Sequence, residues 1–216
     1  MSGENIVNAL AGLLIVTSLL VIETKKPSLS AILYSVQSLV LVGIFLTLAI
    51  SMQATPLYIW AFTALITKVI LVPLILYKSL AKVGNPDQPQ AVLSPSMSLL
   101  IAAIIIGVAF AVVTPFHLQA IIKLKPALAV SIAHFFLGLL CILSQRNIFK
   151  QMLGYCLMEN GSHLTLAMMA YNAPETVEIG ILTDAIFAVI IMAVIGIRIF
   201  KTANTLDTDK LTLLKG

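Results

Sequence analysis

The stretch from Arg146 to Ala170 carries the side chains best suited to acid–base chemistry. Glu159 lies near the middle of this mostly apolar stretch, and His163 follows four residues later, which puts both on one face of a helix. A charge at the centre of a bilayer costs several kcal/mol unless it is paired or lies against water. The stretch therefore predicts a membrane-spanning helix with a functional carboxylate.

Three more ionisable side chains fall inside long apolar runs: Lys68, His134 and Asp184. If each run is a helix, Lys68 and His134 lie close to the same depth as Glu159, near the middle of the membrane. A row of titratable groups at one depth is what lateral proton transfer within a membrane requires. With His163, these residues are the predicted proton or ion path.

Simpler interpretations exist for three of these residues. Lys68 could extend its ammonium to the membrane surface, although pairing with a carboxylate is favoured because about eleven residues separate it from either end of its run. His134 could be a hydrogen-bonded packing residue. His163, with Ser162 and Asn160, could hold helices together by hydrogen bonds.

The other charged residues near helix ends have structural explanations. Asp184 lies close to the start of the last apolar run and could act on the helix dipole instead of on an ion. Glu175 and Glu178 are expected to be loop charges. Lys123 and Lys125 are expected to anchor an interfacial segment.

The composition indicates an integral membrane protein. Of the 216 residues, 60% are hydrophobic and 10% are charged, whereas soluble domains carry about 25% charged residues. The net charge of +4 does not indicate nucleic-acid binding, because the basic residues lie in short loops. No phosphate-binding, hydrolase or zinc motif occurs in the sequence.

No cofactor or metal is expected in this chain. Cys141 and Cys156 fall inside predicted helices and are expected to be free, buried thiols. Two thiolates are too few for an iron–sulfur cluster, which usually has four. His134 and His163 could in principle ligate a heme between helices, but this is the least favoured alternative.

The hydrophobicity pattern predicts an all-α, polytopic integral membrane protein with about seven transmembrane helices. A spanning helix needs about 20 mostly apolar residues, and the first run lacks the basic flank of a removed signal peptide. The predicted helices cover Ile6–Ile22, Leu29–Met52, Leu57–Leu80, Pro95–Val113, Pro126–Leu143, Ile148–Ala170 and Ile179–Phe200.

The predicted helices divide into two units of three around a linking helix. Residues 1–80 form the first unit, 81–125 a loop and the linking helix, 126–200 the second unit and 201–216 a cytoplasmic tail. The tail ends in LTLLKG and is expected at the surface or on a partner. Weak similarity between LAGLLIV and FLGLLCI, one in each unit, leaves a tandem duplication and chance similarity both open.

The distribution of Lys and Arg predicts an N-terminus outside and a C-terminus in the cytoplasm. One side of the predicted topology has ten of these residues, whereas the other has only Lys123 and Lys125. The ten are Lys25, Lys26, Lys78, Lys82, Arg146, Lys150, Arg198, Lys201, Lys210 and Lys215.

Two strings are unusual for apolar helices: GYCLMENGSHL and EIGILTDAIFAV. Through them, and along its whole length, the chain resembles the hydrogenase-4 component E family. The unit 126–200 is also similar to the K subunit of respiratory complex I and to the C subunit of multisubunit antiporters. In that K subunit a buried Glu occurs in each of the last two helices. Asp184 matches the second, whereas Cys156 stands at the first and Glu159 lies about one turn, ~5.4 Å, further along.

The resemblance implies a non-catalytic membrane subunit of a formate hydrogenlyase-type hydrogenase in the bacterial inner membrane. Its partners would be antiporter-like and other membrane subunits and a peripheral hydrogenase arm. The nickel–iron centre and iron–sulfur clusters would belong to those partners. Two alternatives stay open: a purely structural assembly subunit, and a subunit of a multisubunit cation/proton antiporter or complex I-like enzyme.

Overall fold

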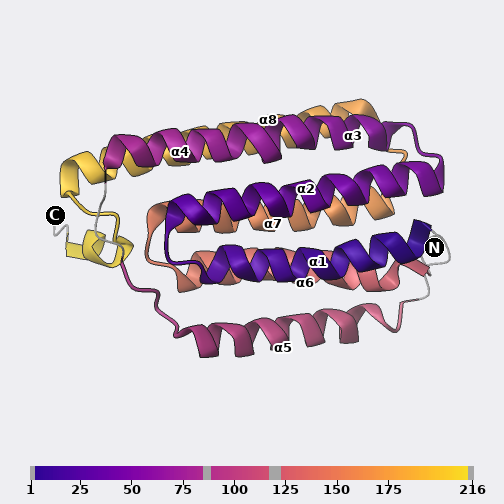
Figure 1. Ribbon diagram of the computed structural model, residues 1–216, viewed down its shortest axis with the longest axis horizontal. Helices are drawn as coiled ribbons and strands as arrows, with labels where there is room; N and C mark the ends of the chain where they lie inside the picture. Colours follow the sequence, from indigo (N-terminus) through magenta and orange to yellow (C-terminus); the bar gives the residue numbers. More distant parts are fainter. Residues whose placement is uncertain (1–2, 85–88, 117–122, 214–216) are drawn as a thin grey trace.

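Long helices that run side by side make up the structure (Figure 1). The computed structural model describes residues 3–84, 89–116 and 123–213. Parts of the predicted 81–125 segment and the end of LTLLKG therefore lie outside the described residues. The helices are α1 (Gly3–Glu23), α2 (Pro27–Met52), α3 (Pro56–Ala64), η1 (Leu65–Leu71), α4 (Val72–Val83), α5 (Pro95–Val113), α6 (Lys125–Ser144), α7 (Ile148–Met169), α8 (Glu175–Ala203) and η3 (Thr208–Leu213).

The seven predicted helices correspond to seven rods, because α3, η1 and α4 follow one another without a break. Some helices end at a residue with a left-handed backbone conformation, and several begin with a proline in the first turn. Gln53 and Asn204 end α2 and α8 with φ of 51°, a conformation that an asparagine or similar residue tolerates at a helix end. Proline suits a first helical turn, where its missing N–H has no partner to lose. Prolines in this position are Pro27, Pro56, Pro95 and Pro126.

Two local differences from the predicted helices affect the site. The rod predicted over Leu57–Leu80 has a π-helical segment, Leu65–Leu71, that contains Lys68. The last helix begins at Glu175, not at Ile179, because Pro174 adopts an extended conformation and the helix starts directly after it. Glu178 therefore belongs to the first turn of α8. The expectation that it is a loop charge was wrong.

The helices form two layers, and those of the first layer pack against those of the second in the order in which they follow along the chain. α1 lies against α6, α2 against α7 and α4 against α8 (Figure 1). α5 contacts mainly α6 and forms the outermost row. The two groups of three rods therefore face one another, and residues from both groups can meet in the interior.

Helices α6 and α7 approach at the backbone, where three glycines lie. A Cβ built on Gly138 would lie 2.7 Å from the carbonyl oxygen of Gly154, and one on Gly161 would lie 2.9 Å from the carbonyl oxygen of Ser131. Such contacts leave no room for a side chain. These glycines therefore allow the close packing of α6 against α7.

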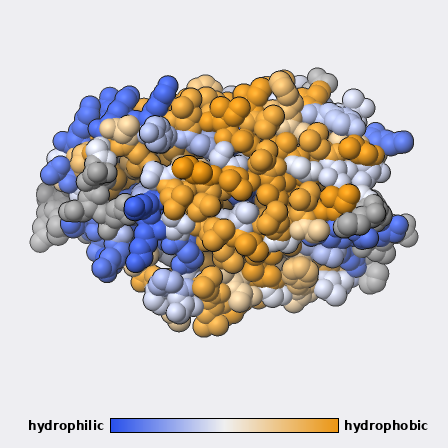
Figure 2. All heavy atoms as spheres, in the orientation of Figure 1, coloured by the Kyte–Doolittle hydropathy of each residue, from blue (hydrophilic) through white to orange (hydrophobic). Residues whose placement is uncertain are grey.

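The chain is a multi-pass membrane protein. Among the described residues, six helical rods are long and apolar enough to cross a bilayer, and apolar side chains form a broad band between more polar ends (Figure 2). The seventh, α7, has 22 residues, enough for about 33 Å of helix. It is less apolar because it carries the interior polar residues, and it lies against α1, α2, α6 and α8.

Lys150 was counted among the loop charges on the basic side, but its side chain is buried, with 2% exposed. Its ammonium donates hydrogen bonds to the Val21, Ile22 and Thr24 carbonyl oxygens and to Ser30 Oγ. A cation suits the C-terminus of α1, whose last carbonyls lack helical partners. Lys150 therefore ties α7 to the α1–α2 turn.

The C-terminal tail folds back onto the chain itself and stays at the surface, as expected: in residues 201–211 every side chain but that of Leu206 is at least partly exposed. Leu206 is buried, and Asn147 and Asp207 form an isolated antiparallel bridge. The backbone N–H of Thr208 donates to the Arg146 carbonyl oxygen at 2.9 Å. The tail thus covers the connection between α6 and α7.

Candidate functional site

Lys68 and Glu159 form an ion pair at the centre of the bundle. The Lys68 ammonium donates to Glu159 Oε1 at 2.6 Å and to Asn160 Oδ1 at 2.8 Å. The Lys68 side chain is 3% exposed and that of Glu159 14%. The expected pairing of Lys68 with a carboxylate is confirmed, and extension to the membrane surface is not observed.

The two partners come from different layers. Lys68 lies in η1, the π-helical segment, and Glu159 lies near the middle of α7. A π-bulge inserts extra backbone into a helix and is frequent at functional sites. The pair compensates two charges that would be costly to bury alone.

A chain of hydrogen bonds runs from this pair across the bundle to α6 and α1. Asn160 Nδ2 donates to Gln37 Oε1 at 2.9 Å. Gln37 Nε2 lies 3.0 Å from His134 Nε2, and His134 Nδ1 lies 2.8 Å from Ser18 Oγ. Ser18 Oγ in turn donates to the Leu14 carbonyl oxygen.

The directions of these bonds are mutually consistent. Since Asn160 Oδ1 accepts from Lys68, its amide nitrogen must donate to Gln37. Gln37 then presents its own nitrogen to His134, whose Nε2 accepts while Nδ1–H donates to Ser18. In this arrangement His134 is neutral, and both ring nitrogens are occupied. A heme ligand at this position would have to displace these bonds.

A second acid–base pair lies about one helical turn nearer the α7 C-terminus. His163 Nε2 lies 2.9 Å from Glu178 Oε2, and Thr63 donates a short hydrogen bond to Glu178 Oε1. Both members of the pair are buried. The His163 ring also packs against Phe45 and Trp60, with ring centroids at 4.8 and 5.0 Å.

Sequence reasoning missed Glu178, although a signal was present. Ala185, Val189 and Ala193 follow it by seven, eleven and fifteen residues and are all buried. This spacing marks one face of a helix. Glu178 begins that inward face, which the late predicted start of the helix concealed.

Asp184 is exposed on α8, well past its first turn. The helix-dipole alternative for Asp184 therefore loses its support, since that effect is confined to the first turn. Asp184 instead faces a hollow of about 290 Å³ between α7 and α8 that Glu159, His163 and Tyr155 also line. This hollow brings together members of both acid–base pairs and Asp184.

The structure thus joins the predicted residues in three ways. Lys68, Glu159 and His134 belong to one hydrogen-bonded network. His163 belongs to a second pair, and Asp184 meets Glu159 and His163 only through the hollow. In the part of the chain that the structure describes, no group of three or more metal-ligating side chains could hold an ion.

Known proteins resemble this chain at two levels: a family model matches its C-terminal part, and curated relatives match its full length. The family model of NADH-ubiquinone/plastoquinone oxidoreductase chain 4L matches residues 126–216, which include α6, α7 and α8. The chain is 53% identical, over 216 residues and the full length of both chains, to Hydrogenase-4 component E of Escherichia coli, and equally to that of Shigella flexneri. The chain therefore belongs to the hydrogenase-4 component E family, as its sequence motifs predicted.

A more distant relative covers almost the same length. An uncharacterized protein of Mycobacterium tuberculosis is 24% identical over 97% of this chain and 96% of its own. No solved structure matches this chain.

Proposed function

We propose that this chain is a non-catalytic membrane subunit of a formate hydrogenlyase-type hydrogenase, and that its buried acid–base network is part of the complex's ion-translocation path. The family membership supports the hydrogenase assignment, and the match to chain 4L supports a complex I-like place in the assembly. The nickel–iron centre and iron–sulfur clusters would be on partner subunits. The complex would lie in the bacterial inner membrane.

The observation that carries the transport proposal is the position of the Lys68–Glu159 pair. On one side Glu159 lines the hollow with Asp184 and His163. On the other side the pair connects through Asn160 to the network that reaches His134. The carboxamides of Asn160 and Gln37 orient the charged pair but do not titrate, so the proton steps would run between the titratable side chains that share the hollow, Glu159, His163 and Asp184.

Glu178 and His163 extend the proposed path toward one face of the membrane. Glu178 lies in the first turn of α8, and His163 lies one turn along α7 from Glu159. A proton could therefore be taken up at the Glu178–His163 pair and passed through the hollow to Glu159. Asp184, exposed on the same hollow, would face an antiporter-like partner subunit.

Replacing Glu159 by Gln tests this role. Gln keeps the size and one acceptor oxygen but cannot carry charge, so we expect the complex to assemble and to produce hydrogen while ion pumping falls several-fold. Pumping is followed by acidification of inverted membrane vesicles, and hydrogen by gas electrode. Glu4→Gln is the matched control, because Glu4 is partly exposed and, within the described residues, its ion pair is with the exposed Lys123.

Unchanged pumping in Glu159→Gln would remove the case for the ion path. A second candidate function is that of a purely structural assembly subunit. It is favoured by the hydrogen bonds at both ring nitrogens of His134, because a residue that only packs helices together would also make them. It predicts that Glu159→Gln fails to assemble on a native gel. A complex that purifies without nickel would instead favour an antiporter or complex I-like enzyme.

A further inference from the structure

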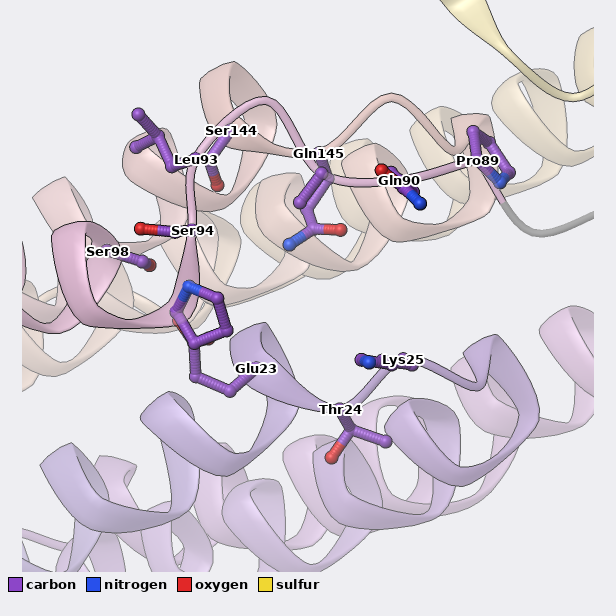
Figure 3. Close-up of a pocket in the computed structure, with 12 residues that line it drawn as sticks. Glu23, Thr24, Lys25, Pro89, Gln90, Leu93, Ser94, Ser98, Ser144 and Gln145 are labelled. Atoms are coloured by element: carbon purple, nitrogen blue, oxygen red, sulfur yellow. The ribbon is translucent and has the colours of Figure 1, made fainter.

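A second hollow, of about 450 Å³, opens where α1 ends, α5 begins and α6 ends (Figure 3). It lies away from the acid–base network and has no part in the proposed ion path. Glu23 and Lys25 line it from the end of α1, Ser94 from the start of α5, and Ser144 and Gln145 from the end of α6. Because three helix ends meet here, the hollow lies at the depth where lipid headgroups meet the protein.

Two polar groups in this hollow lack partners within the chain. Ser144 is 2% exposed, and its Oγ has no hydrogen-bond partner. Glu23 Oε1 is also buried without a partner. Buried polar atoms are nearly always hydrogen-bonded, so an unpaired hydroxyl and an unpaired carboxylate oxygen in one hollow require a partner from outside the chain.

The nearby buried cation does not satisfy the carboxylate. The three N–H donors of the Lys150 ammonium already have four acceptors within hydrogen-bond distance, three of them carbonyl oxygens at the end of α1. Among the described residues, Glu23 forms no ion pair. A ligand for Glu23 should therefore bring a cation with N–H donors.

Another part of the same hollow favours a negatively charged group. Lys25 lines it, and the N-terminus of α5, capped by Ser94, carries the positive end of a helix dipole. These groups suit a phosphate. An ammonium and a phosphate in one small molecule describe a phosphoethanolamine group.

Apolar surface leads away from the hollow into the membrane. Leu13, Val16 and Leu20 of α1 are all exposed and lie on one stripe of the helix that ends beside Glu23. Acyl chains attached to a headgroup in the hollow would follow these side chains.

We propose that this hollow binds the headgroup of an aminophospholipid, with the ammonium on Glu23 and Ser144 and the phosphate near Lys25 and the start of α5. The bound lipid would fill the space between α5 and the rest of the bundle at this membrane face. It would hold α5, which otherwise contacts mainly α6.

The test is native mass spectrometry of the full-length chain, delipidated in detergent and titrated with dioleoyl phosphatidylethanolamine. Phosphatidylcholine and phosphatidylglycerol with the same acyl chains are the comparison lipids, because the first has no N–H donor and the second no amine. We expect both to bind at least about tenfold more weakly than phosphatidylethanolamine. Glu23→Gln should abolish this preference and Ser144→Ala should weaken it, whereas Glu4→Gln at the other end of α1 should keep it.

Four results would overturn the proposal. The three lipids could bind equally, or Glu23→Gln could keep the full preference. Glycerophosphoethanolamine, which lacks acyl chains, could bind as tightly as the lipid and so identify a soluble ligand. In the intact complex, carbodiimide could cross-link Glu23 to a partner lysine with no aminophospholipid retained. The comparison of lipids on the unmodified chain decides the matter even if a variant fails to fold.

Discussion

At the scale of single residues, the interior of this protein depends on pairs of opposite charge and not on isolated ions. Lys68 and Glu159 meet at 2.6 Å, and His163 and Glu178 at 2.9 Å. Burial makes each partner dependent on the other, because removing one leaves an uncompensated group in an apolar interior. The loss of stability caused by a substitution should therefore depend on whether it leaves the partner charge buried and unpaired.

Lys68→Met should show this dependence. It leaves the Glu159 carboxylate without its cation, and breaking a buried pair in this way typically costs about 3–5 kcal/mol. We expect a clear drop in the thermal midpoint of the detergent-solubilised protein. The double variant Lys68→Met/Glu159→Leu should recover much of the loss, since no lone charge remains. Equal midpoints for the single variant and the unmodified protein would contradict the pair's importance.

Glu178→Ala should also destabilise the protein. It removes the acceptor for Thr63 and the partner of His163, and each unsatisfied buried group costs about 1–3 kcal/mol. Glu178→Gln retains one acceptor oxygen and should recover part of the stability. Thermal unfolding followed by fluorescence distinguishes the two variants. A loop charge would give the same midpoint for both, equal to that of the unmodified protein.

At the scale of elements, the contact between α6 and α7 fixes where the site residues lie. Glycines at Gly138 and Gly161 let the two backbones approach, and His134 and Glu159 project from these same helices. Separating the helices would move both parts of the network. The division into two three-helix units stays a prediction, although the pairing of α1 with α6, α2 with α7 and α4 with α8 is what a duplication would produce.

Gly138→Leu should force α6 and α7 apart. Even a Cβ at this position would lie 2.7 Å from the Gly154 carbonyl oxygen, and overpacking of this kind typically costs about 1–3 kcal/mol. We expect a lower thermal midpoint and less monodisperse protein in size-exclusion chromatography. Gly107→Leu is the control, because a Cβ there meets nothing within 4 Å. A similar loss in both variants would contradict the role of the close approach.

At the scale of the whole molecule, the described chain begins and ends at opposite ends of the bundle, because its number of helical rods is odd (Figure 1). The predicted orientation has the N-terminus outside and the C-terminus in the cytoplasm. The exposed residues Asn172 and Asn204 lie at opposite ends of α8 and offer a direct test.

Cysteine labelling can measure the orientation. In intact spheroplasts, Asn172→Cys should react with a membrane-impermeant maleimide, whereas Asn204→Cys should react only after lysis. Cys141 and Cys156 are buried and should contribute little background. Labelling in the reverse order would contradict the predicted topology. It would put the start of α8, and with it the Glu178–His163 pair, toward the cytoplasm.

The sequence alone determined the class of this protein, because apolar runs of spanning length and the position of basic residues need no tertiary information. It also identified Lys68, His134, Glu159, His163 and Asp184 as unusual, since polar residues stand out against an apolar background.

Only the tertiary structure decided which of these residues meet. The partners Lys68 and Glu159 are 91 residues apart in the chain, and Gln37 and His134 are 97 apart. Their contact depends on how the two layers of helices face one another, which periodicity within a single helix does not encode. For the same reason Glu178 became a buried partner of His163 only once α8 was seen to begin one turn earlier.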